Sequence, residues 1–166
     1  MRAWMVMMLL ILPLAATARA EDQRAEAERY FRAGERAYNA GQYDIAAQAF
    51  EEAYQVLAVP AIAFSTAQAY RLQYFIDKEP ARLKRAVELY RLYVDQQKSG
   101  GRVSDAAASL AELSPLLLRL EAEGKMMGTI ARQQTTRLMV VSQVDGARGT
   151  IDGEGGALPL TKEVTP

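Results

Sequence analysis

The side chains that could carry out chemistry in this 166-residue chain are carboxylates, lysines and hydroxyl groups, because the sequence has no histidine and no cysteine. The commonest general base, the thiolate nucleophile and nearly all zinc ligands are therefore missing. Glu51 and Glu52 are adjacent, but adjacent residues point to different sides of a helix and cannot act on one substrate. We expect both to be solvated.

Three acidic residues of the glycine-rich tail, Asp145, Asp152 and Glu154, could suggest a calcium site. Their spacing fits no EF-hand loop, so we interpret them as turn residues. The stretches "GARG" and "GEGG" are not followed by the helix and the Lys-Ser/Thr pair of a phosphate-binding loop. We predict no metal site, no cofactor and no enzymatic activity.

The N-terminus has the features of a secretory signal peptide. Arg2 precedes an apolar run of 13 residues, Trp4 to Ala16, and small residues follow at Ala18 and Ala20. A membrane span needs roughly 20 apolar residues, so the run favours a signal peptide over residues 1–20, cleaved after Ala20. An uncleaved membrane anchor is the alternative.

The charge balance of the mature chain argues against nucleic acid as a partner. Removing Arg2 and Arg19 leaves 18 basic against 20 acidic residues, without the basic excess that phosphate binding requires. We expect an exported protein in the periplasm or cell envelope of a Gram-negative bacterium, with no membrane span after signal cleavage. Its core must hold without disulfides.

Helical periodicity dominates the first part of the mature chain. It predicts four helices, at residues 22–39, 43–57, 61–76 and 80–97. Gly41 can adopt the positive φ that ends a helix at little conformational energy, and Pro60 and Pro80 suit the first turns of the helices that follow. Helices joined by such short turns form antiparallel hairpins.

A fifth helix should follow the flexible joint at residues 98–102, with Ser104 or Asp105 as its N-cap. Its apolar residues follow steps of three and four, so one face stays buried for several turns. Pro115 interrupts this helix. Either the helix kinks there, which the unbroken apolar seam favours, or it restarts with Ser114 as N-cap.

The tail after Gly124 changes to a β pattern. "TRLMVVS" is β-branched and apolar, and "ARGTID" alternates. The glycines that we expect to mark turns are Gly146, Gly149, Gly153, Gly155 and Gly156. The pattern predicts a short β hairpin or two strands within residues 125–166.

The first helical hairpin has small and aromatic residues at fixed intervals: Tyr30, Gly34, Gly41, Tyr43, Ala46, Phe50 and Ala53. With these residues at this spacing, the hairpin closely resembles the tetratricopeptide repeat. The second hairpin is a poorer copy, in which Ala67, Tyr70, Ala86 and Tyr90 match, the inter-helix turn is longer, and Tyr93 replaces a small residue. The resemblance covers residues 25 to 97. The fifth helix would then be the cap that a short repeat array needs.

The resemblance implies a concave groove, lined by the first helix of each hairpin, that binds a peptide or partner segment. Carried over residue by residue, the groove would be lined by Glu28, Phe31, Glu35, Asn39, Gln68 and Arg71. Two alternatives are that these side chains are merely solvated, or that Phe31 packs under the N-terminus.

In the tail, a first strand ending in Ser142 is followed by Gly146-Ala147, Ile151-Asp152-Gly153 and Pro159-Leu160. With these features the tail resembles the start of a PEGA domain, a small β module of exported bacterial proteins. The proline of the family motif is absent, with Gln143-Val144-Asp145 in its place. The chain is then either a piece of a longer protein or one that ends in a simple extension.

The sequence thus predicts a mainly α fold of antiparallel helical hairpins, with a capping helix and a short C-terminal β segment. The units would be the signal peptide at residues 1–20, two hairpins at 21–97, linker and cap at 98–124, and the β segment at 125–166. We expect a non-enzymatic scaffold that binds a protein or peptide through its concave face. The alternative is a structural oligomerisation or stalk module, and a homodimer is a possible assembly.

Overall fold

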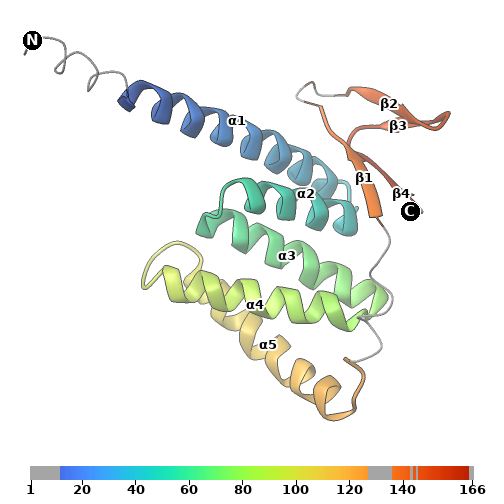
Figure 1. The fold of residues 1–166 in the computed structure, drawn as a ribbon. Helices are drawn as coiled ribbons and strands as arrows, with labels where there is room; N and C mark the ends of the chain where they lie inside the picture. Colours follow the sequence, from blue (N-terminus) through green and yellow to red (C-terminus); the bar gives the residue numbers. More distant parts are fainter. Residues whose placement is uncertain (1–11, 127–135, 143, 145, 165–166) are drawn as a thin grey trace, which may run out of the picture.

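The computed structural model describes residues 12–126, 136–142, 144 and 146–164 (Figure 1). The chain forms five helices followed by four short strands. The helices are α1 (Leu12–Asn39), α2 (Tyr43–Val56), α3 (Pro60–Asp77), α4 (Pro80–Gln96) and α5 (Val103–Ala122). The strands are β1 (Thr136–Val140), β2 (Arg148–Ile151), β3 (Glu154–Ala157) and β4 (Leu160–Val164).

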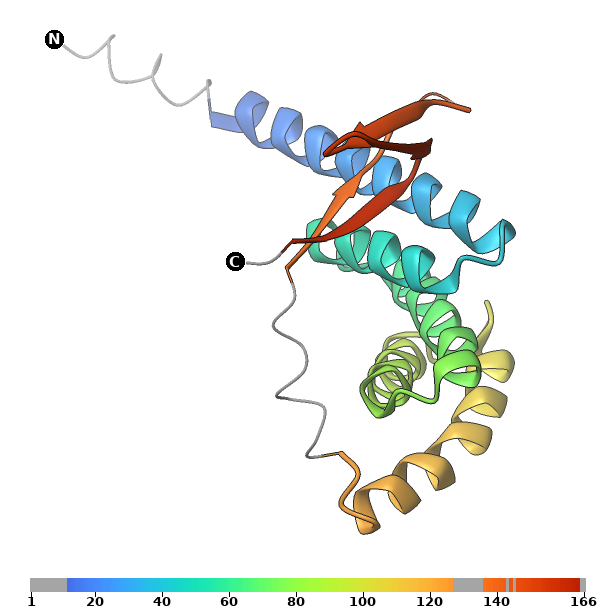
Figure 2. The same ribbon diagram turned by 90° about the vertical axis from the view of Figure 1, so that its right-hand side faces the viewer.

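Each helix packs against the next one in sequence, from α1 to α5, so that the helices form a stacked array (Figures 1 and 2). The predicted mainly α fold of consecutive helix pairs with a short C-terminal β segment is confirmed. The helix ends lie at the glycine and proline residues that predicted them. Gly41, at φ 75°, lies in the turn after α1, and Pro60 and Pro80 begin α3 and α4.

The contact between α1 and α2 depends on small residues around one aromatic ring. Phe50 is buried among alanines of α1, α2 and α3. A Cβ on Gly34 would lie only 2.5 Å from Cδ1 of Phe50, so the missing side chain allows this close approach. Phe31 packs on the same ring, with 5.0 Å between the ring centroids.

The second hairpin has a larger core, which α5 completes. Phe64 of α3 lies against Tyr90 and Tyr93 of α4, at centroid distances of 5.6 and 5.1 Å. Leu113 and Leu117 of α5 are buried in the same cluster. The last helix therefore covers the second hairpin, as the leucine seam predicts.

The structure corrects the predicted N-cap of α5 and decides between the two alternatives for Pro115. The helix begins at Val103, and its N-cap is Arg102 rather than Ser104 or Asp105. The amide of Arg102 donates instead to the hydroxyl of Tyr93 at 2.9 Å, so a residue of α4 fixes the start of α5. The helix continues through Pro115 without a break, which excludes a restart at Ser114.

The β segment contains more strands than predicted. β1 pairs with β4 and β2 pairs with β3, both antiparallel. Asp152 and Gly153, at φ 51° and 85°, form the two-residue turn between β2 and β3, which is the preferred Asp-Gly hairpin turn.

The expectation that Gly149, Gly155 and Gly156 mark turns was wrong, because all three lie within strands. Gly149 and Gly156 face each other across the β2–β3 pair. A Cβ on Gly156 would lie 2.7 Å from Cδ1 of Leu160, and one on Gly149 would lie 3.1 Å from Cδ2 of Leu158. The glycines therefore make room for leucine side chains.

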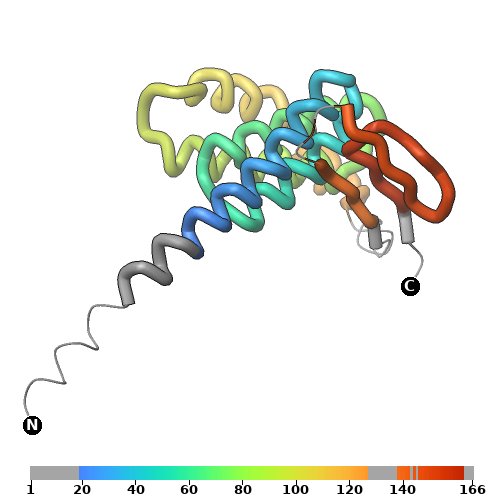
Figure 3. Tube along the Cα trace, turned by 90° about the horizontal axis from the view of Figure 1, so that it is seen from above, coloured from blue at the N-terminus to red at the C-terminus, as the bar shows by residue number. Residues whose placement is uncertain are grey.

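The strands lie beside α1, at the end of the array opposite to α5 (Figures 1 and 3). Arg36 of α1 donates from Nη2 to the carbonyl oxygen of Ser142 at 2.8 Å, which links the two parts of the chain. The predicted cleavage site after Ala20 falls inside α1, and residues 1–11 of the predicted signal peptide lie outside the described residues. No helix in the described part of the chain combines the length and the apolarity that a membrane crossing requires.

Candidate partner-binding surface

The six residues predicted to line a groove come from α1 and α3, and the structure gives the two groups different surroundings. On α1, Glu28, Glu35 and Asn39 are exposed. Glu28 accepts a hydrogen bond from Arg32 one turn further on, at 2.5 Å. Glu35 and Asn39 extend this polar face toward the C-terminal end of α1.

Phe31 belongs to the packing between α1 and α2 more than to the surface. Its side chain is partly buried, and its ring lies against Phe50 rather than under the N-terminus. Phe31 therefore offers a partner only the remaining part of one ring.

The two residues on α3, Gln68 and Arg71, form hydrogen bonds with residues of α5 and its N-cap. Arg71 donates from Nε and Nη2 to one carboxylate oxygen of Glu112, at 3.0 and 2.6 Å. Gln68 accepts a longer hydrogen bond from Arg102, at 3.4 Å.

Arg102 connects α5 to α3 in a second way. Its guanidinium lies over the ring of Phe64, 4.3 Å from the centroid, which is the geometry of a cation–π contact. Its Nε also donates to Asp105 at 2.9 Å. The sequence pattern did not identify Arg102 and Glu112, because their partners on α3 lie more than thirty residues away along the chain.

Tyr38 is a further residue of this side of the molecule that the groove pattern did not select. Its ring meets Tyr43 edge-on, with 5.3 Å between the centroids. Burial, followed by the neighbouring Tyr43, raises the pKa of the Tyr38 hydroxyl, while Arg102 and Arg71 act in the opposite direction.

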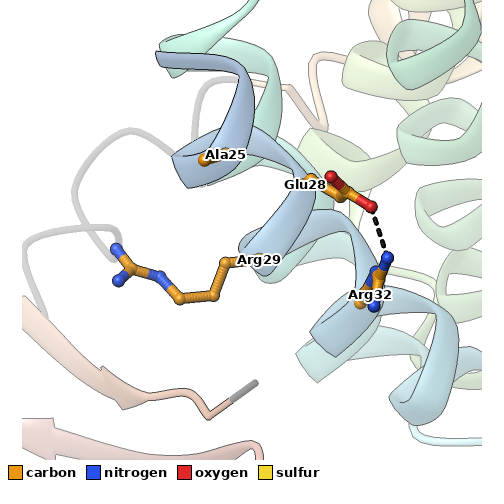
Figure 4. A pocket seen from close by; sticks show the side chains of 4 residues that line it. All are labelled: Ala25, Glu28, Arg29 and Arg32. Carbon is orange, nitrogen blue, oxygen red and sulfur yellow. Dashed lines mark hydrogen bonds and ion pairs between the residues drawn. The ribbon is translucent and has the colours of Figure 1, made fainter. Parts of the chain in front are cut away.

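A shallow hollow of about 320 Å³ lies on α1 next to this face. Among the described residues it is lined by Ala25, Glu28, Arg29 and Arg32 (Figure 4). Glu28 and Arg32 face each other as an ion pair, whereas Arg29 extends away from them on the side where the strands lie. The two arginines therefore do not converge on one point, and the hollow has no built anion site.

Three of the acidic residues that the sequence placed in the solvent or in turns, Glu51, Asp152 and Glu154, have ion-pair partners. Glu51 was expected to be solvated, but its side chain is only 16% exposed and pairs with Arg85. The expectation was wrong because α4 carries this arginine back against α2. In the tail, Lys162 lies 3.2 Å from Asp152 and 3.6 Å from Glu154, while Asp145 is outside the described residues.

Glu51 also joins a polar cluster that spans three helices. Arg85 of α4 donates to both of its carboxylate oxygens, and Tyr70 on α3 lies close enough for the charge of Glu51 to act on its hydroxyl. Burial first, and then the charge of Glu51, raises the pKa of Tyr70 far above its ordinary value. The cluster holds α2, α3 and α4 together.

Comparison of the chain with protein-family models, with curated proteins and with solved structures found no match.

Proposed function

We propose that this protein is an exported, non-enzymatic scaffold that binds another protein or a peptide through the exposed face of α1. The helical hairpins would work as tetratricopeptide repeats do, in the periplasm or cell envelope. The proposal combines the repeat-like residues of the first hairpin, the signal peptide predicted at residues 1–20 and the polar face described above.

The observation that carries the proposal is the division of α1 into packing and non-packing residues. Gly34 and Tyr38 face the other helices, while Glu35 and Asn39, next to them in sequence, are exposed. Among the described residues, the side chains of Glu35 and Asn39 have no hydrogen-bond or ion-pair partner. Such groups are available for the hydrogen bonds that an extended segment needs.

The α3 part of the predicted groove contributes differently to this proposal. Because Arg71 and Gln68 are bonded to α5, they set the position of the last helix and leave recognition to α1. A change at Arg71 would disturb the helix array as well as any partner, so it is a poor probe of binding.

The experiment is affinity capture from an envelope extract, with the captured proteins quantified by mass spectrometry. The bait is compared with a Glu35→Lys/Asn39→Ala variant and with an Asp95→Lys control. Asp95 is exposed on α4, so this control makes the same charge reversal away from the α1 face. We expect a partner that the control retains and the α1 variant loses. Equal capture by both variants would refute the α1 face as the binding surface.

A further inference from the structure

A row of exposed, uncharged residues runs along α5 on the face that points away from its buried residues Ala106, Leu113 and Leu117. Its members follow steps of three and four residues and are all exposed: Ser104, Ala107, Ala111, Pro115, Leu118 and Ala122. Leu118 is the large apolar residue of the row, and 64% of its surface is exposed. The other side chains of the row are small, and all six of its residues are exposed in the described part of the chain.

The outer row of α4 is the internal comparison. It has the same spacing and is also exposed, but each of its members is charged: Lys84, Glu88, Arg91 and Asp95. The chain therefore does place charges on helical rows that face water. Depletion of charge together with exposed apolar side chains is characteristic of the centre of an interface.

We infer that this row of α5 is the contact through which two copies of the chain associate, with their α5 helices antiparallel. The row has small side chains in its first half and Leu118 in its second half. A two-fold axis close to Glu112 brings Leu118 of one copy opposite Ser104 and Ala107 of the other. The bulky and the small halves of the row then complement each other twice.

The charges beside the row fit the same arrangement. Asp105 and Arg119 lie seven residues before and after Glu112, which puts them on one side of the helix. Antiparallel pairing about Glu112 sets Asp105 of each copy opposite Arg119 of the other, whereas in a parallel two-fold pair the two copies of these charges lie on opposite sides of the contact and do not meet. Each of these residues has an intrahelical partner but stays more than half exposed, at 53% and 68%.

The charge at the axis is already compensated within each copy, because Glu112 accepts hydrogen bonds from Arg71 of its own chain. The α5 helix also lies at the end of the array opposite to the strands (Figures 1 and 2). Association through α5 therefore leaves the α1 face accessible, and the inference stands independently of the proposed partner binding.

The first test is sedimentation velocity of the purified chain over a wide concentration range. Ala111→Glu puts a carboxylate at the centre of the row, and Ala25→Glu makes the same change at an exposed position of α1. We expect a monomer–dimer equilibrium that Ala111→Glu weakens at least about tenfold, because like charges across an interface cost several kcal/mol. The Ala25→Glu control should associate as the parent does.

The second test uses the absence of cysteine from the natural sequence. Single cysteines at Ala111, Ser104 and Ala122 are treated with a short bis-maleimide. In the antiparallel pair Ala111→Cys should cross-link to itself, while Ser104→Cys should not, because its two copies lie on the order of 25 Å apart. A mixture of Ser104→Cys and Ala122→Cys should give a covalent dimer.

The cross-linking pattern keeps the inference falsifiable even if Ala111→Glu disturbs the helix. A chain that remains monomeric at every concentration would overturn it. So would an Ala111→Glu variant that is folded by circular dichroism and dimerises as tightly as the parent. Self-cross-linking of Ser104→Cys would show parallel helices and overturn the proposed arrangement.

Discussion

At the residue scale, Gly34 shows how one missing side chain sets the distance between two helices. The ring of Phe50 occupies the space that a Cβ on Gly34 would need, and Phe31 closes the other side of the ring. A glycine in a helix costs roughly 0.5–1 kcal/mol relative to alanine. This cost is offset by the burial of the aromatic ring, since fully burying a large apolar side chain contributes roughly 1.5–3 kcal/mol.

A second kind of residue-scale contact is the partly buried polar cluster of Glu51, Arg85 and Tyr70 at the junction of three helices. The carboxylate of Glu51 accepts hydrogen bonds from Arg85 through both of its oxygens, and Tyr70 lies beside this ion pair. Removing one partner of such a cluster costs more than a surface ion pair contributes, because the remaining groups are left buried without hydrogen bonds.

This cluster makes the stability depend on pH in alkali. The folded state raises the pKa of Tyr70 above the ordinary value of 10.0, so its stabilising effect is complete below about pH 10 and declines above it. The decline approaches about 1.4 kcal/mol for each further pH unit, until the folded pKa is reached. We expect Tyr70→Phe to keep the neutral-pH stability of the parent within about 1 kcal/mol and to show a shallower alkaline decline, because the titrating hydroxyl is gone.

The measurement is the free energy of unfolding in urea, followed from neutral pH to about pH 11 for both chains. Tyr90 keeps some pH dependence in the variant, because burial raises the pKa of its hydroxyl as well. An alkaline decline of equal slope in parent and Tyr70→Phe would show that Tyr70 does not titrate as described.

At the scale of elements, the helices could be predicted from the sequence because their signals are local. Turn residues such as Gly41, Pro60 and Pro80 stand within two residues of the helix ends in the structure. The N-cap of α5 was missed because it depends on a contact from Tyr93 on another helix, which no local pattern encodes.

The strands were harder to predict for the same physical reason. β3 has the sequence EGGA, which lacks the β-branched residues that indicate a strand, and it forms because it pairs with β2. β1 pairs with β4 across twenty residues of chain, so a hairpin expected from neighbouring segments gives the wrong partner. On the candidate partner-binding surface, the exposure of the α1 residues can be predicted from helical periodicity. The ion pair between Arg71 and Glu112 cannot, because the two residues lie far apart in the sequence.

Pro115 allows a prediction about α5. A proline inside a helix removes a backbone hydrogen bond and crowds the preceding turn, at a cost of about 3 kcal/mol. Replacing it also gives the unfolded chain more freedom, which takes back up to about 1 kcal/mol. We therefore expect Pro115→Ala to raise the free energy of unfolding in urea by about 2 kcal/mol.

Pro80 is the matched control for this change. It stands at the first turn of α4, where a proline leaves no intrahelical hydrogen bond unmade. Pro80→Ala should change the stability little or lower it slightly. If Pro115→Ala were no more stable than the parent, α5 would have to relieve the proline by a local distortion.

At the scale of the whole molecule, the chain consists of a helical array and a β segment that share few contacts. The three hydrophobic clusters of the described residues are built from helix residues and from Leu57, Val59 and Met126 next to helix ends, and contain no strand residue. The hydrogen bond from Arg36 to Ser142 contributes about 1 kcal/mol when such a bond is partly buried. The helices should therefore fold without the strands.

This independence is tested by a chain that ends at Met126. We expect it to unfold in one cooperative transition, with a midpoint within about 5 °C of the full chain, because a loss of about 1 kcal/mol shifts the midpoint of a domain this size by that much. The strands alone should show no cooperative transition, since two-stranded ribbons are marginal in water. If the shortened chain lost its transition, the helices would need the β segment in order to fold, and the structure of the α1 face would depend on the strands beside it.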